Sequence, residues 1–309
     1  VFGMNIGYFA DGPWSHEAIK LISETEGVKI SFIVPRYDTQ DPVLKQWAEN
    51  IGVPFIPCKD VNSLDFLNDI EKHKADLFIS MSFNQILKKE IISFPRLGFV
   101  NCHAGALPFY RGRNPLNWVL INGEDSFGIT VHYVDEGIDT GDIIEQRLFP
   151  ITLIDDYSSL LVKAITECAN VLHSATLKIY HNSVRKIKQT DIHPIGTYFG
   201  MRTFGDEIVD FNLPAVQIHN FIRALTKPGP VARCYIGEKE LGIISSELIA
   251  NAPRYIATVG EVIGRNVDGI IVKVGDSSIK VKSIVDISDG LLSDSYIPQF
   301  RVGTRFKLI

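Results

Sequence analysis

The segment Gly98-Phe99-Val100-Asn101-Cys102-His103 begins as an apolar run and ends in polar side chains, directly before a loop with glycine and proline at residues 104–112. If residues 99–103 form a strand, the alternation of side chains places Asn101 and His103 on one face and Cys102 on the other. Open α/β sheets bind their ligands at the carboxyl ends of strands. On spacing alone, the simpler interpretation is a polar pair that completes a strand end, and a ligand site is the alternative.

A second polar cluster follows the next apolar run. Residues 128–134 are predicted to form a strand, which leads into the loop Asp135–Asp142 with its four carboxylates and two glycines. Such a loop is ordinarily a solvated turn or a loose cation site. His132 lies inside the apolar strand, so we expect it to be a hydrogen-bonded structural histidine.

The residues before about position 205 alternate between strand-like and helix-like patterns. This alternation predicts a Rossmann-like α/β domain with a mostly parallel sheet. The predicted strands cover residues 5–9, 28–34, 76–80, 99–103, a run around Thr130, and 143–149. The predicted helices cover residues 16–25, 42–50, 63–72, 84–92 and 157–180.

The pattern changes after residue 205. A short helix is predicted at 215–224, and Lys227-Pro228-Gly229-Pro230 ends it. Short strands separated by glycine, aspartate and serine turns follow at 231–235, 241–245, 260–263, 269–274 and 278–284. We therefore predict two domains, residues 1–205 and a small β-rich domain at 206–309 that resembles a barrel of the OB type.

The composition is that of a globular protein without a strong overall charge. The chain has 309 residues, of which 45% are hydrophobic and 22% charged, and a net charge of −5. An isoelectric point near 5.9 provides no positive field for nucleic acid. The four cysteines are scattered without zinc-type spacing, and no apolar stretch approaches the roughly 20 residues of a membrane span. We expect a cytoplasmic protein with free thiols, no metal, no nucleic-acid partner and no membrane association.

Three separated elements occur in the order found in one known family. They are the Asn101-x-His103 pair, Leu107-Pro108 with Gly112, and Asp139 followed by Gly141. With these elements the chain resembles the formyltransferases that use 10-formyltetrahydrofolate. One position departs from the family pattern, because Gly105 stands where a serine is often found. The resemblance continues into residues 224–237, which look like the sugar-modifying and tRNA-modifying branches of the family.

The resemblance implies an N-formyltransferase whose catalytic residues are Asn101, His103 and Asp139. The Asn101 amide can donate a hydrogen bond to the oxyanion that forms on the formyl carbonyl. The His103 imidazole can accept the proton that the attacking amine loses, because imidazole titrates near neutral pH. Asp139 can orient that imidazole and favour its charged form. This chemistry needs no metal.

The resemblance also implies the formyl donor, N10-formyltetrahydrofolate. In the family the pterin lies between the loop after the third strand and the acidic loop. The matching residues in this chain are Phe83, Gln85, Ile86 and Leu87 in the first loop and Asp135, Gly137 and Asp142 in the second. The alternative for Phe83, Ile86 and Leu87 is an ordinary helix–sheet core.

The acceptor implied by the resemblance is a nucleotide-linked amino sugar. The tRNA branch carries a basic inserted loop, whereas residues 35–42 are short and contain one cation, Arg36. We expect aromatic and arginine side chains to bind the sugar nucleotide. These residues are Trp14, Tyr110, Arg113, Tyr198 and Arg202. The single substrate that we favour is a dTDP-, UDP- or GDP-linked 4-amino-4,6-dideoxyhexose used in O-antigen or lipopolysaccharide synthesis. We expect the enzyme to be a homodimer.

Two other functions remain open at this point. Methionyl-tRNA formyltransferase would use the same donor and the same three residues on a different acceptor. A formyltetrahydrofolate hydrolase would use them with water, although that family carries an additional N-terminal regulatory domain for which we find no counterpart in this sequence.

Overall fold

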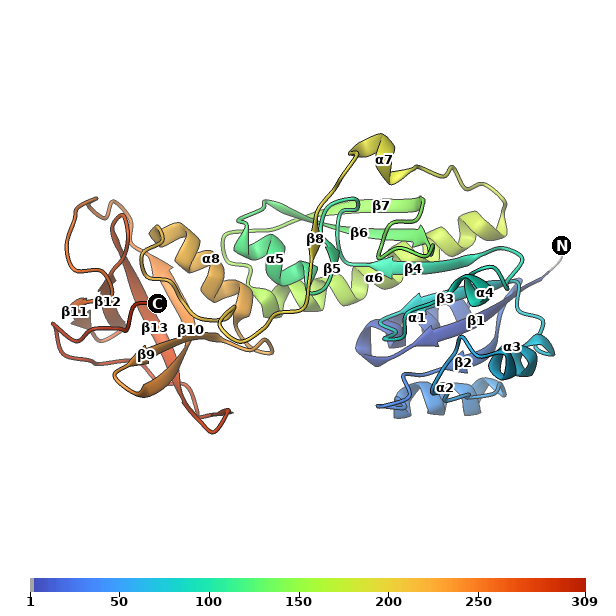
Figure 1. Cartoon of the computed structure of the whole chain (residues 1–309), viewed down its shortest axis with the longest axis horizontal. Helices are drawn as coiled ribbons and strands as arrows, with labels where there is room; N and C mark the ends of the chain where they lie inside the picture. Colours follow the sequence, from blue (N-terminus) through green and yellow to red (C-terminus); the bar gives the residue numbers. More distant parts are fainter. Residues whose placement is uncertain (1–2) are drawn as a thin grey trace. The chain divides into compact units, whose positions relative to one another are not determined.

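The computed structural model describes residues 3–309, which divide into two compact units (Figure 1). The N-terminal unit runs to Pro115 and also includes Phe127–Phe149 and Val162–Phe199. The C-terminal unit consists of Leu116–Ser126, Pro150–Leu161 and Gly200–Ile309. None of the helices within residues 3–309 has the length and apolarity that a membrane crossing requires.

A six-stranded sheet forms the centre of the N-terminal unit. Its strands are β1 (Met4–Ala10), β2 (Val28–Val34), β3 (Leu77–Met81), β4 (Phe99–His103), β6 (Ser126–Tyr133) and β7 (Ile143–Pro150). They lie in the order β2-β1-β3-β4-β6-β7. The strands β2, β1, β3 and β4 are parallel, and β6 is antiparallel to β4. This arrangement confirms the predicted α/β fold with a mostly parallel sheet.

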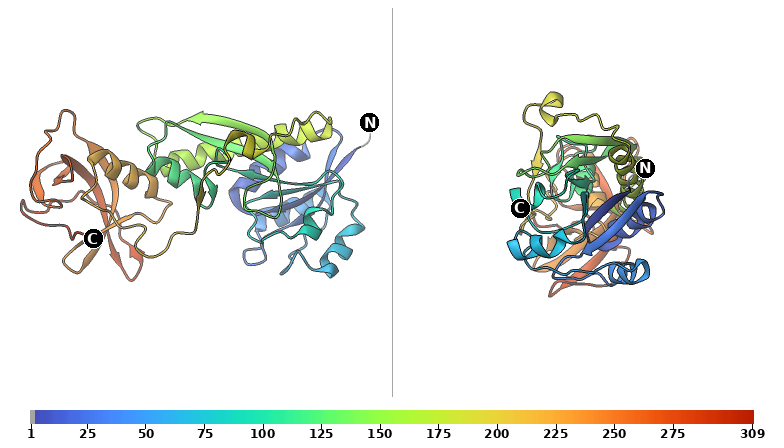
Figure 2. Two further views of the ribbon diagram at one scale, coloured as in Figure 1. Left: turned by 45° about the horizontal axis from the view of Figure 1, so that its top comes forward. Right: turned by 90° about the vertical axis from the view of Figure 1, so that its right-hand side faces the viewer.

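Helices cover both faces of this sheet, as Figures 1 and 2 show. The helices are α1 (Gly12–Ser23), α2 (Pro42–Ile51), α3 (Leu64–Glu71), α4 (Lys89–Ile92) and α6 (Tyr157–Tyr180). Under α3 and α4 lies an aromatic core, in which the Phe9 ring is 5.1 Å from the rings of both Phe78 and Phe99. On the other face, the Tyr8 hydroxyl donates to the carbonyl of Ser15 in α1. Alternate residues of each strand therefore face different helices.

Residues 84–92 do not form the single helix that their pattern predicts. Only Lys89–Ile92 is helical, and the preceding residues form a loop. Ser82 has a φ of 58°, which turns the chain away from a direct strand-to-helix connection. The Gln85 side chain then donates to the Cys58 carbonyl and accepts from the Val61 amide, which holds the loop extended. Tertiary hydrogen bonds thus override the local helical pattern.

A short two-stranded sheet, which the sequence pattern did not predict, lies beside the main one. It joins β5 (Arg111–Gly112) to β8 (Tyr198–Phe199) in parallel. The chain reaches β8 through α7 (Gln189–Ile192), after Ile187 has paired with Ile143 at the start of β7. We call residues 187–199 the closing segment, because it runs from β7 to the loop that follows β4 (Figure 1).

The C-terminal unit contains α5 (Pro115–Ile121) from Leu116 onward, α8 (Ala215–Leu225) and an antiparallel sheet. The sheet strands are β9 (Ala232–Ile236), β10 (Lys239–Leu248), β11 (Val262–Asn266), β12 (Gly269–Lys273), β13 (Ser278–Ser288) and β14 (Leu291–Leu292). Their order is β11-β12-β13-β10-β9, with β14 on β13. The last residues of the chain bond to both edges of this sheet. Phe306 N–H donates to the carbonyl of Gly260, just before β11, and Lys307 N–H donates to the carbonyl of Tyr235 in β9, each at 2.8 Å. The sheet therefore curls toward a barrel.

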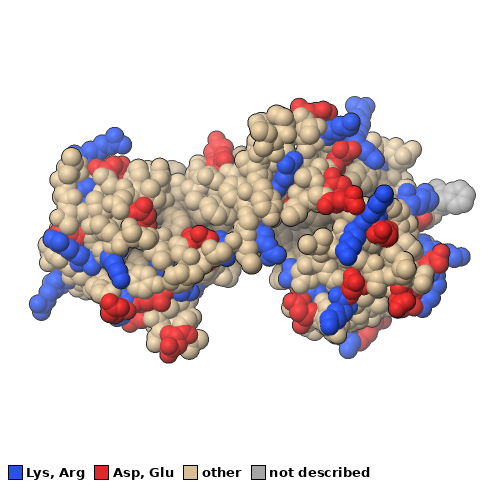
Figure 3. Space-filling view, viewed as in Figure 1, with Lys and Arg blue, Asp and Glu red and all other residues tan. Residues whose placement is uncertain are grey.

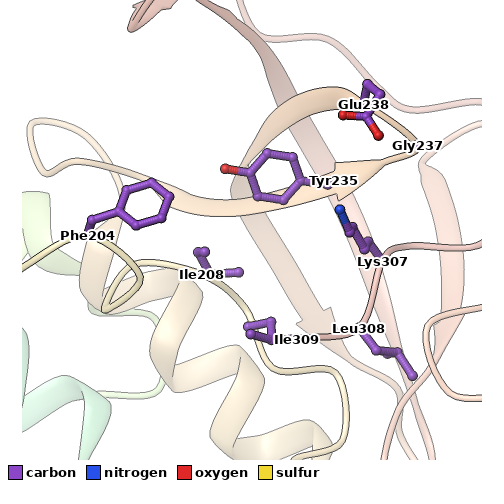
Figure 4. A pocket seen from close by; sticks show the side chains of 8 residues that line it. All are labelled: Phe204, Ile208, Tyr235, Gly237, Glu238, Lys307, Leu308 and Ile309. Carbon is purple, nitrogen blue, oxygen red and sulfur yellow. The ribbon is translucent and has the colours of Figure 1, made fainter.

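A pocket opens on this unit near the chain end (Figure 4). Its lining consists mainly of apolar side chains, with one lysine and one glutamate at its edge: Phe204, Ile208, Tyr235, Gly237, Glu238, Lys307, Leu308 and Ile309. Every one of these residues belongs to the C-terminal unit, and none is among the predicted catalytic residues.

Candidate active site

Strand β4 presents Asn101 and His103 on the face that carries the aromatic core. The neighbouring Cys102 points the other way, where its Sγ lies 3.7 Å from the carbonyl oxygen of Cys168 in α6. In the pairing of β4 with β6, Asn101 lies opposite His132 and His103 opposite Thr130. The alternation read from the sequence therefore holds, and His132 joins the same face.

The acidic loop folds back over this face. Because β6 is antiparallel to β4 and Tyr133 pairs with Val100, the loop leaves the sheet beside the start of β4. It nevertheless brings Asp139 to the end of β4, where Asp139 Oδ2 accepts a hydrogen bond from the Gly112 amide at 2.9 Å. Asp139 Oδ2 lies 3.7 Å from His103 Nδ1, and Asp139 Oδ1 lies 3.5 Å from His132 Nε2. One carboxylate thus faces two imidazoles.

The partners of the two imidazoles determine which nitrogen carries the proton in each neutral ring. His103 Nε2 lies 2.6 Å from the Tyr110 carbonyl oxygen, and His132 Nδ1 lies 2.8 Å from the Tyr133 carbonyl oxygen. A carbonyl oxygen can only accept, so these nitrogens must be the donors. His103 Nδ1 and His132 Nε2 are then unprotonated, and both face Asp139. The Asn101 Nδ2, 3.4 Å from His132 Nε2, donates toward that lone pair.

The charge of Asp139 is stabilised by its surroundings. Burial alone would raise the pKa of this carboxyl, but the positive charge of His103 and His132 when these rings are protonated, together with the Gly112 amide, outweighs burial and holds the pKa well below its usual value. The side chain of Asp139 is 14% exposed, so these interactions act with little solvent screening. The site therefore keeps an anion next to two nitrogens that can each accept a proton.

The backbone of the acidic loop leaves little freedom to the residues that build it. A Cβ on Gly141 would lie 1.7 Å from the Tyr133 carbonyl oxygen, so only glycine fits there. The predicted donor-binding residue Asp135 accepts from the Gly137 amide at 3.0 Å and from the Thr140 hydroxyl at 2.6 Å. Asp142 accepts the Tyr133 amide through its backbone carbonyl. Asp135, Gly137 and Asp142 thus all shape the loop that carries Asp139.

The loop after β4 is fastened by side chains from the neighbouring strands. The Thr130 hydroxyl donates to the Gly105 carbonyl at 2.7 Å, and the Gln146 amide donates to the Leu107 carbonyl at 2.8 Å. Gly105 replaces the serine of the family pattern, and a Cβ there would lie 2.8 Å from both His103 Nε2 and the Tyr110 carbonyl oxygen. The absence of a side chain therefore gives room for the hydrogen bond between them.

The predicted donor-binding residues after β3 have mixed positions. Phe83 and Leu87 are half-buried against the aromatic core, as the core interpretation predicts for them. Ile86 differs, because it is 80% exposed. Both the oxygen and the nitrogen of the Gln85 amide bond to backbone groups, of residues 61 and 58, so its contribution here is to the shape of the loop.

The predicted acceptor-binding residues also separate into groups. Tyr110 stacks on Phe199 with ring centroids 5.3 Å apart, and Tyr198 is 56% exposed beside it. The Arg113 side chain is exposed at the end of β5, and Trp14 is half-exposed at the start of α1. Arg202 belongs to the C-terminal unit, where its Nε lies 3.5 Å from Glu207.

Two site residues were missed by the sequence analysis or given a smaller role. His132 is buried and hydrogen-bonded, as expected, but it also faces Asp139 and Asn101. Its sequence signal was its place three residues before the acidic loop, on the inward face of the strand. No pattern in the sequence pointed to Gln189 as a site residue, because it contacts the acidic loop across about 50 residues of chain. Among residues 3–309, no cluster of His, Cys, Asp and Glu is arranged to hold a metal ion.

Known proteins resemble this chain in both sequence and fold. The formyl transferase family matches residues 8–176, and the formyl transferase C-terminal domain matches residues 203–288. The bifunctional polymyxin resistance protein ArnA of Wigglesworthia glossinidia brevipalpis is 37% identical over 196 residues, which make up 63% of this chain and 30% of ArnA. The methionyl-tRNA formyltransferase of Caldanaerobacter subterraneus subsp. tengcongensis is 32% identical over 262 residues, 84% of this chain and 79% of that enzyme.

Solved structures share the fold at lower sequence identity. The sugar 3N-formyl transferase WlaRD, determined with dTDP and 5-N-formyl-THF, has a TM-score of 0.67 at 23% identity and covers 93% of this chain and 98% of its own. The N-formyltransferase from Helicobacter canadensis, in complex with folinic acid and dTDP-3-aminofucose, has a TM-score of 0.68 at 20% identity and covers 95% and 100%. Since the family match extends over more than half of the sequence, this chain belongs to the formyl transferase family.

Proposed function

We propose that this enzyme transfers the formyl group of N10-formyltetrahydrofolate to the amino group of a nucleotide-linked amino sugar. The observation that carries the chemistry is the position of the Asp139 carboxylate between the unprotonated nitrogens of His103 and His132, with the Asn101 amide beside them. A proton released into this group of side chains gains a carboxylate partner, and an amide donor is at hand for an oxyanion.

The proton of the attacking amine goes to His103 Nδ1. His103 Nε2 already donates to the Tyr110 carbonyl, so Nδ1 is the free base of the ring. Once Nδ1 is protonated it becomes a donor toward Asp139 Oδ2, 3.7 Å away in the resting site, and the contact shortens into a charge-assisted hydrogen bond. Asp139 thus orients the base and stabilises its charged form.

Asn101 stabilises the oxygen of the formyl group. One hydrogen of its Nδ2 is directed to His132 Nε2, which leaves the second free for the oxygen as it becomes negative. His132 holds that amide in place, because its own Nδ1 is committed to the Tyr133 carbonyl. A comparable side-chain donor contributes roughly 3–4 kcal/mol to the transition state.

The formyl donor fits between the loop after β3 and the acidic loop. Phe83 and Leu87 offer apolar surface continuous with the core, and Ile86 is exposed for a ligand to cover. The acidic loop offers backbone groups and the carboxylate of Asp142. When bound, the donor would supply the formyl carbon that the amine attacks; the bond between that carbon and N10 of the folate then breaks, and protonated His103 returns the amine's proton to N10. This pairing of apolar surface and polar edge suits a flat heterocycle.

Four observations favour a sugar nucleotide over tRNA. The single cation of residues 35–42, Arg36, donates to the carbonyl and hydroxyl oxygens of Ser82 and is not offered to a phosphate. On the face shown in Figure 3, basic and acidic side chains are interspersed. Arg113 is exposed beside the site and forms no ion pair within residues 3–309, so it is suited to a pyrophosphate. The solved structures named above carry dTDP or a dTDP-sugar at this fold.

Methionyl-tRNA formyltransferase is the second candidate, because relatives of that name align over most of this chain. The enzyme of Caldanaerobacter subterraneus named above covers 84% of it at 32% identity, and that of Citrifermentans bemidjiense covers 91% at 29% identity. The same side chains at Asn101, His103 and Asp139 would serve either acceptor. The two proposals therefore differ only in what binds around Arg113 and residues 35–42, and a direct test can separate them.

A screen of acceptors tests the proposed substrate class. The purified enzyme is incubated with N10-formyltetrahydrofolate and a set of dTDP-, UDP- and GDP-linked amino sugars, and products are read by mass. We expect the mass of one formyl group to be added to at least one of them, with a shallow dependence on salt because a single pyrophosphate is bound.

The same screen includes methionyl-tRNA as a competitor. Formylation of the tRNA with a steep salt dependence, and no turnover of any amino-sugar nucleotide, would overturn the sugar assignment. For an active sugar nucleotide, Arg113→Ala should raise KM and leave the donor KM unchanged. Lys29→Ala, at an exposed position in β2, serves as the matched loss of a positive charge.

The roles of His103 and Asn101 are tested by removing each side chain. His103→Ala should lower kcat by roughly 10²–10⁴-fold, the range of a positioned general base. Asn101→Ala should lower kcat by roughly 10²–10³-fold through the loss of one oxyanion donor. Steady-state kinetics on the active acceptor measure both. Near-normal kcat in two folded variants would refute the mechanism.

Asp139→Asn separates proton transfer from donor binding. We expect a strong fall in kcat with little change in donor KM, whereas a loss of donor affinity at full kcat would assign Asp139 to the pterin pocket. Stability provides a second measurement. Because the folded-state pKa of Asp139 is lowered, ionised Asp139 stabilises the folded protein fully above the ordinary pKa of about 3.9, and this stabilisation is lost as the pH falls through the folded value. The free energy of unfolding of the wild type should therefore fall toward that of Asp139→Asn only in acid.

A further inference from the structure

The amide of Gln189 in α7 links the closing segment to the acidic loop. Its Nε2 donates to the carbonyl oxygens of Asp139 at 2.7 Å and of Gly141 at 2.8 Å. Its Oε1 accepts from Arg111 Nε at 3.0 Å and Nη2 at 2.8 Å. The side chain is buried, with 3% of its surface exposed. Both hydrogens and the oxygen of this amide therefore have partners.

The orientation of this amide is unambiguous. Arg111 can only donate, and the two carbonyls can only accept, so the oxygen must face Arg111 and the nitrogen must face the loop. A flipped amide would place two N–H groups against a guanidinium and an oxygen against two carbonyls. Arg111 is itself anchored, since its Nη1 donates to the Ile195 carbonyl at 3.0 Å. Arg111 thus holds the donor end of Gln189 toward Asp139.

Gln189 acts at the point where the acidic loop is strained. Asp139 has a φ of 54°, in the left-handed region that a residue with a Cβ rarely adopts. Such a conformation is disfavoured and persists only where neighbouring groups enforce it. The Gln189 hydrogen bonds restrain the carbonyl of this residue and that of Gly141, while the Gly112 amide restrains the carboxylate.

We propose that Gln189, oriented by Arg111, is a positioning residue that fixes the Asp139 carboxylate between the two imidazoles. The inference rests on the proposed function for its consequence in catalysis, but its structural part stands independently of any substrate. Asp139 lies 3.5 Å and 3.7 Å from the imidazole nitrogens, so a small shift of the loop would change which imidazole it can bond when a proton arrives. Without Gln189, the carboxylate would be held at its Gly112 end only.

Gln189→Glu tests the proposal with almost no change of shape. The carboxylate keeps its contact with Arg111, but it replaces both N–H donors by an oxygen that faces two carbonyls. The Gly112 amide reports the position of Asp139, because it donates to Asp139 Oδ2. We expect its hydrogen exchange, followed by NMR, to be at least about tenfold faster than in the wild type. Asp139→Ala, which removes the acceptor, marks the fastest exchange that this loss can produce.

Kinetics supply the second arm, on the acceptor found active in the screen. Gln189→Glu should lower kcat on the order of 10²-fold, the cost of a misplaced catalytic group, with KM little changed. In an Asp139→Asn background the same substitution should cost little more, because its effect passes through Asp139. A merely structural role would give the same loss in both backgrounds.

Controls keep the two arms separate. Gln299→Glu makes the same exchange of atoms in the C-terminal unit, where Gln299 Nε2 donates to the Asn266 carbonyl, and should leave Gly112 exchange and kcat unchanged. If Gln189→Glu does not fold, Gln189→Met removes the donors without adding a charge. Wild-type exchange at Gly112 in the folded variant, or additive losses of kcat, would overturn the proposal. If the wild type formylates nothing, only the proposed function fails, and the exchange arm still decides the role of Gln189.

Discussion

The hydrogen bond from the Gly112 amide to the Asp139 carboxylate is the contact on which the whole site depends. It joins the loop after β4, which carries the Tyr110 carbonyl, to the loop after β6, which carries the anion. The two loops leave the sheet at opposite ends of the antiparallel pair of β4 and β6, and this contact brings them together at the carboxyl end of β4. Gly141 lets the acidic loop pass close to the strand, and Gln189 of the closing segment restrains the loop by donating to its carbonyl groups. The buried carboxylate is thereby held beside two imidazoles, and its charge is stabilised by the Gly112 amide and, when they are protonated, by the imidazoles.

The arrangement of protons around this carboxylate explains how one site can both accept a proton and stabilise an anion. Each neutral imidazole donates its N–H to a backbone carbonyl, His103 to that of Tyr110 and His132 to that of Tyr133. The other nitrogen of each ring therefore turns a lone pair toward Asp139. The distances of 3.5 and 3.7 Å are long for hydrogen bonds, as expected when neither nitrogen has a hydrogen to share. When His103 Nδ1 takes the proton of the amine, it can donate to Asp139, and the distance between them shortens. The Asn101 amide, held by His132, remains available to the oxyanion, so the two tasks do not compete.

The sequence analysis predicted what depends on local pattern and on the family resemblance, and it missed what depends on long-range hydrogen bonds. The alternation in residues 99–103 placed Asn101 and His103 on one face, and the apolar strands and amphipathic helices predicted the α/β sheet with its β-rich C-terminal part. The helix predicted over 84–92 was largely wrong, because Gln85 bonds to backbone groups that lie about 25 residues away. His132 was expected to be structural because the strand pattern cannot show that the acidic loop folds back onto it. Gln189 and Arg111 were not considered for the site, since their meeting depends on the closing segment, which has no regular pattern of its own.

The central claim is that both imidazoles present unprotonated nitrogens to Asp139 in the resting enzyme. Two-bond ¹H–¹⁵N correlation spectra of the histidine side chains, recorded on the ¹⁵N-labelled full chain at a pH where the rings are neutral, measure this directly, and His103→Gln and His132→Gln variants assign the signals. The account predicts that neutral His103 carries its hydrogen on Nε2 and neutral His132 carries its hydrogen on Nδ1. A neutral His103 with its hydrogen on Nδ1, donated to Asp139, would contradict it, because the base would then have no free nitrogen facing the carboxylate.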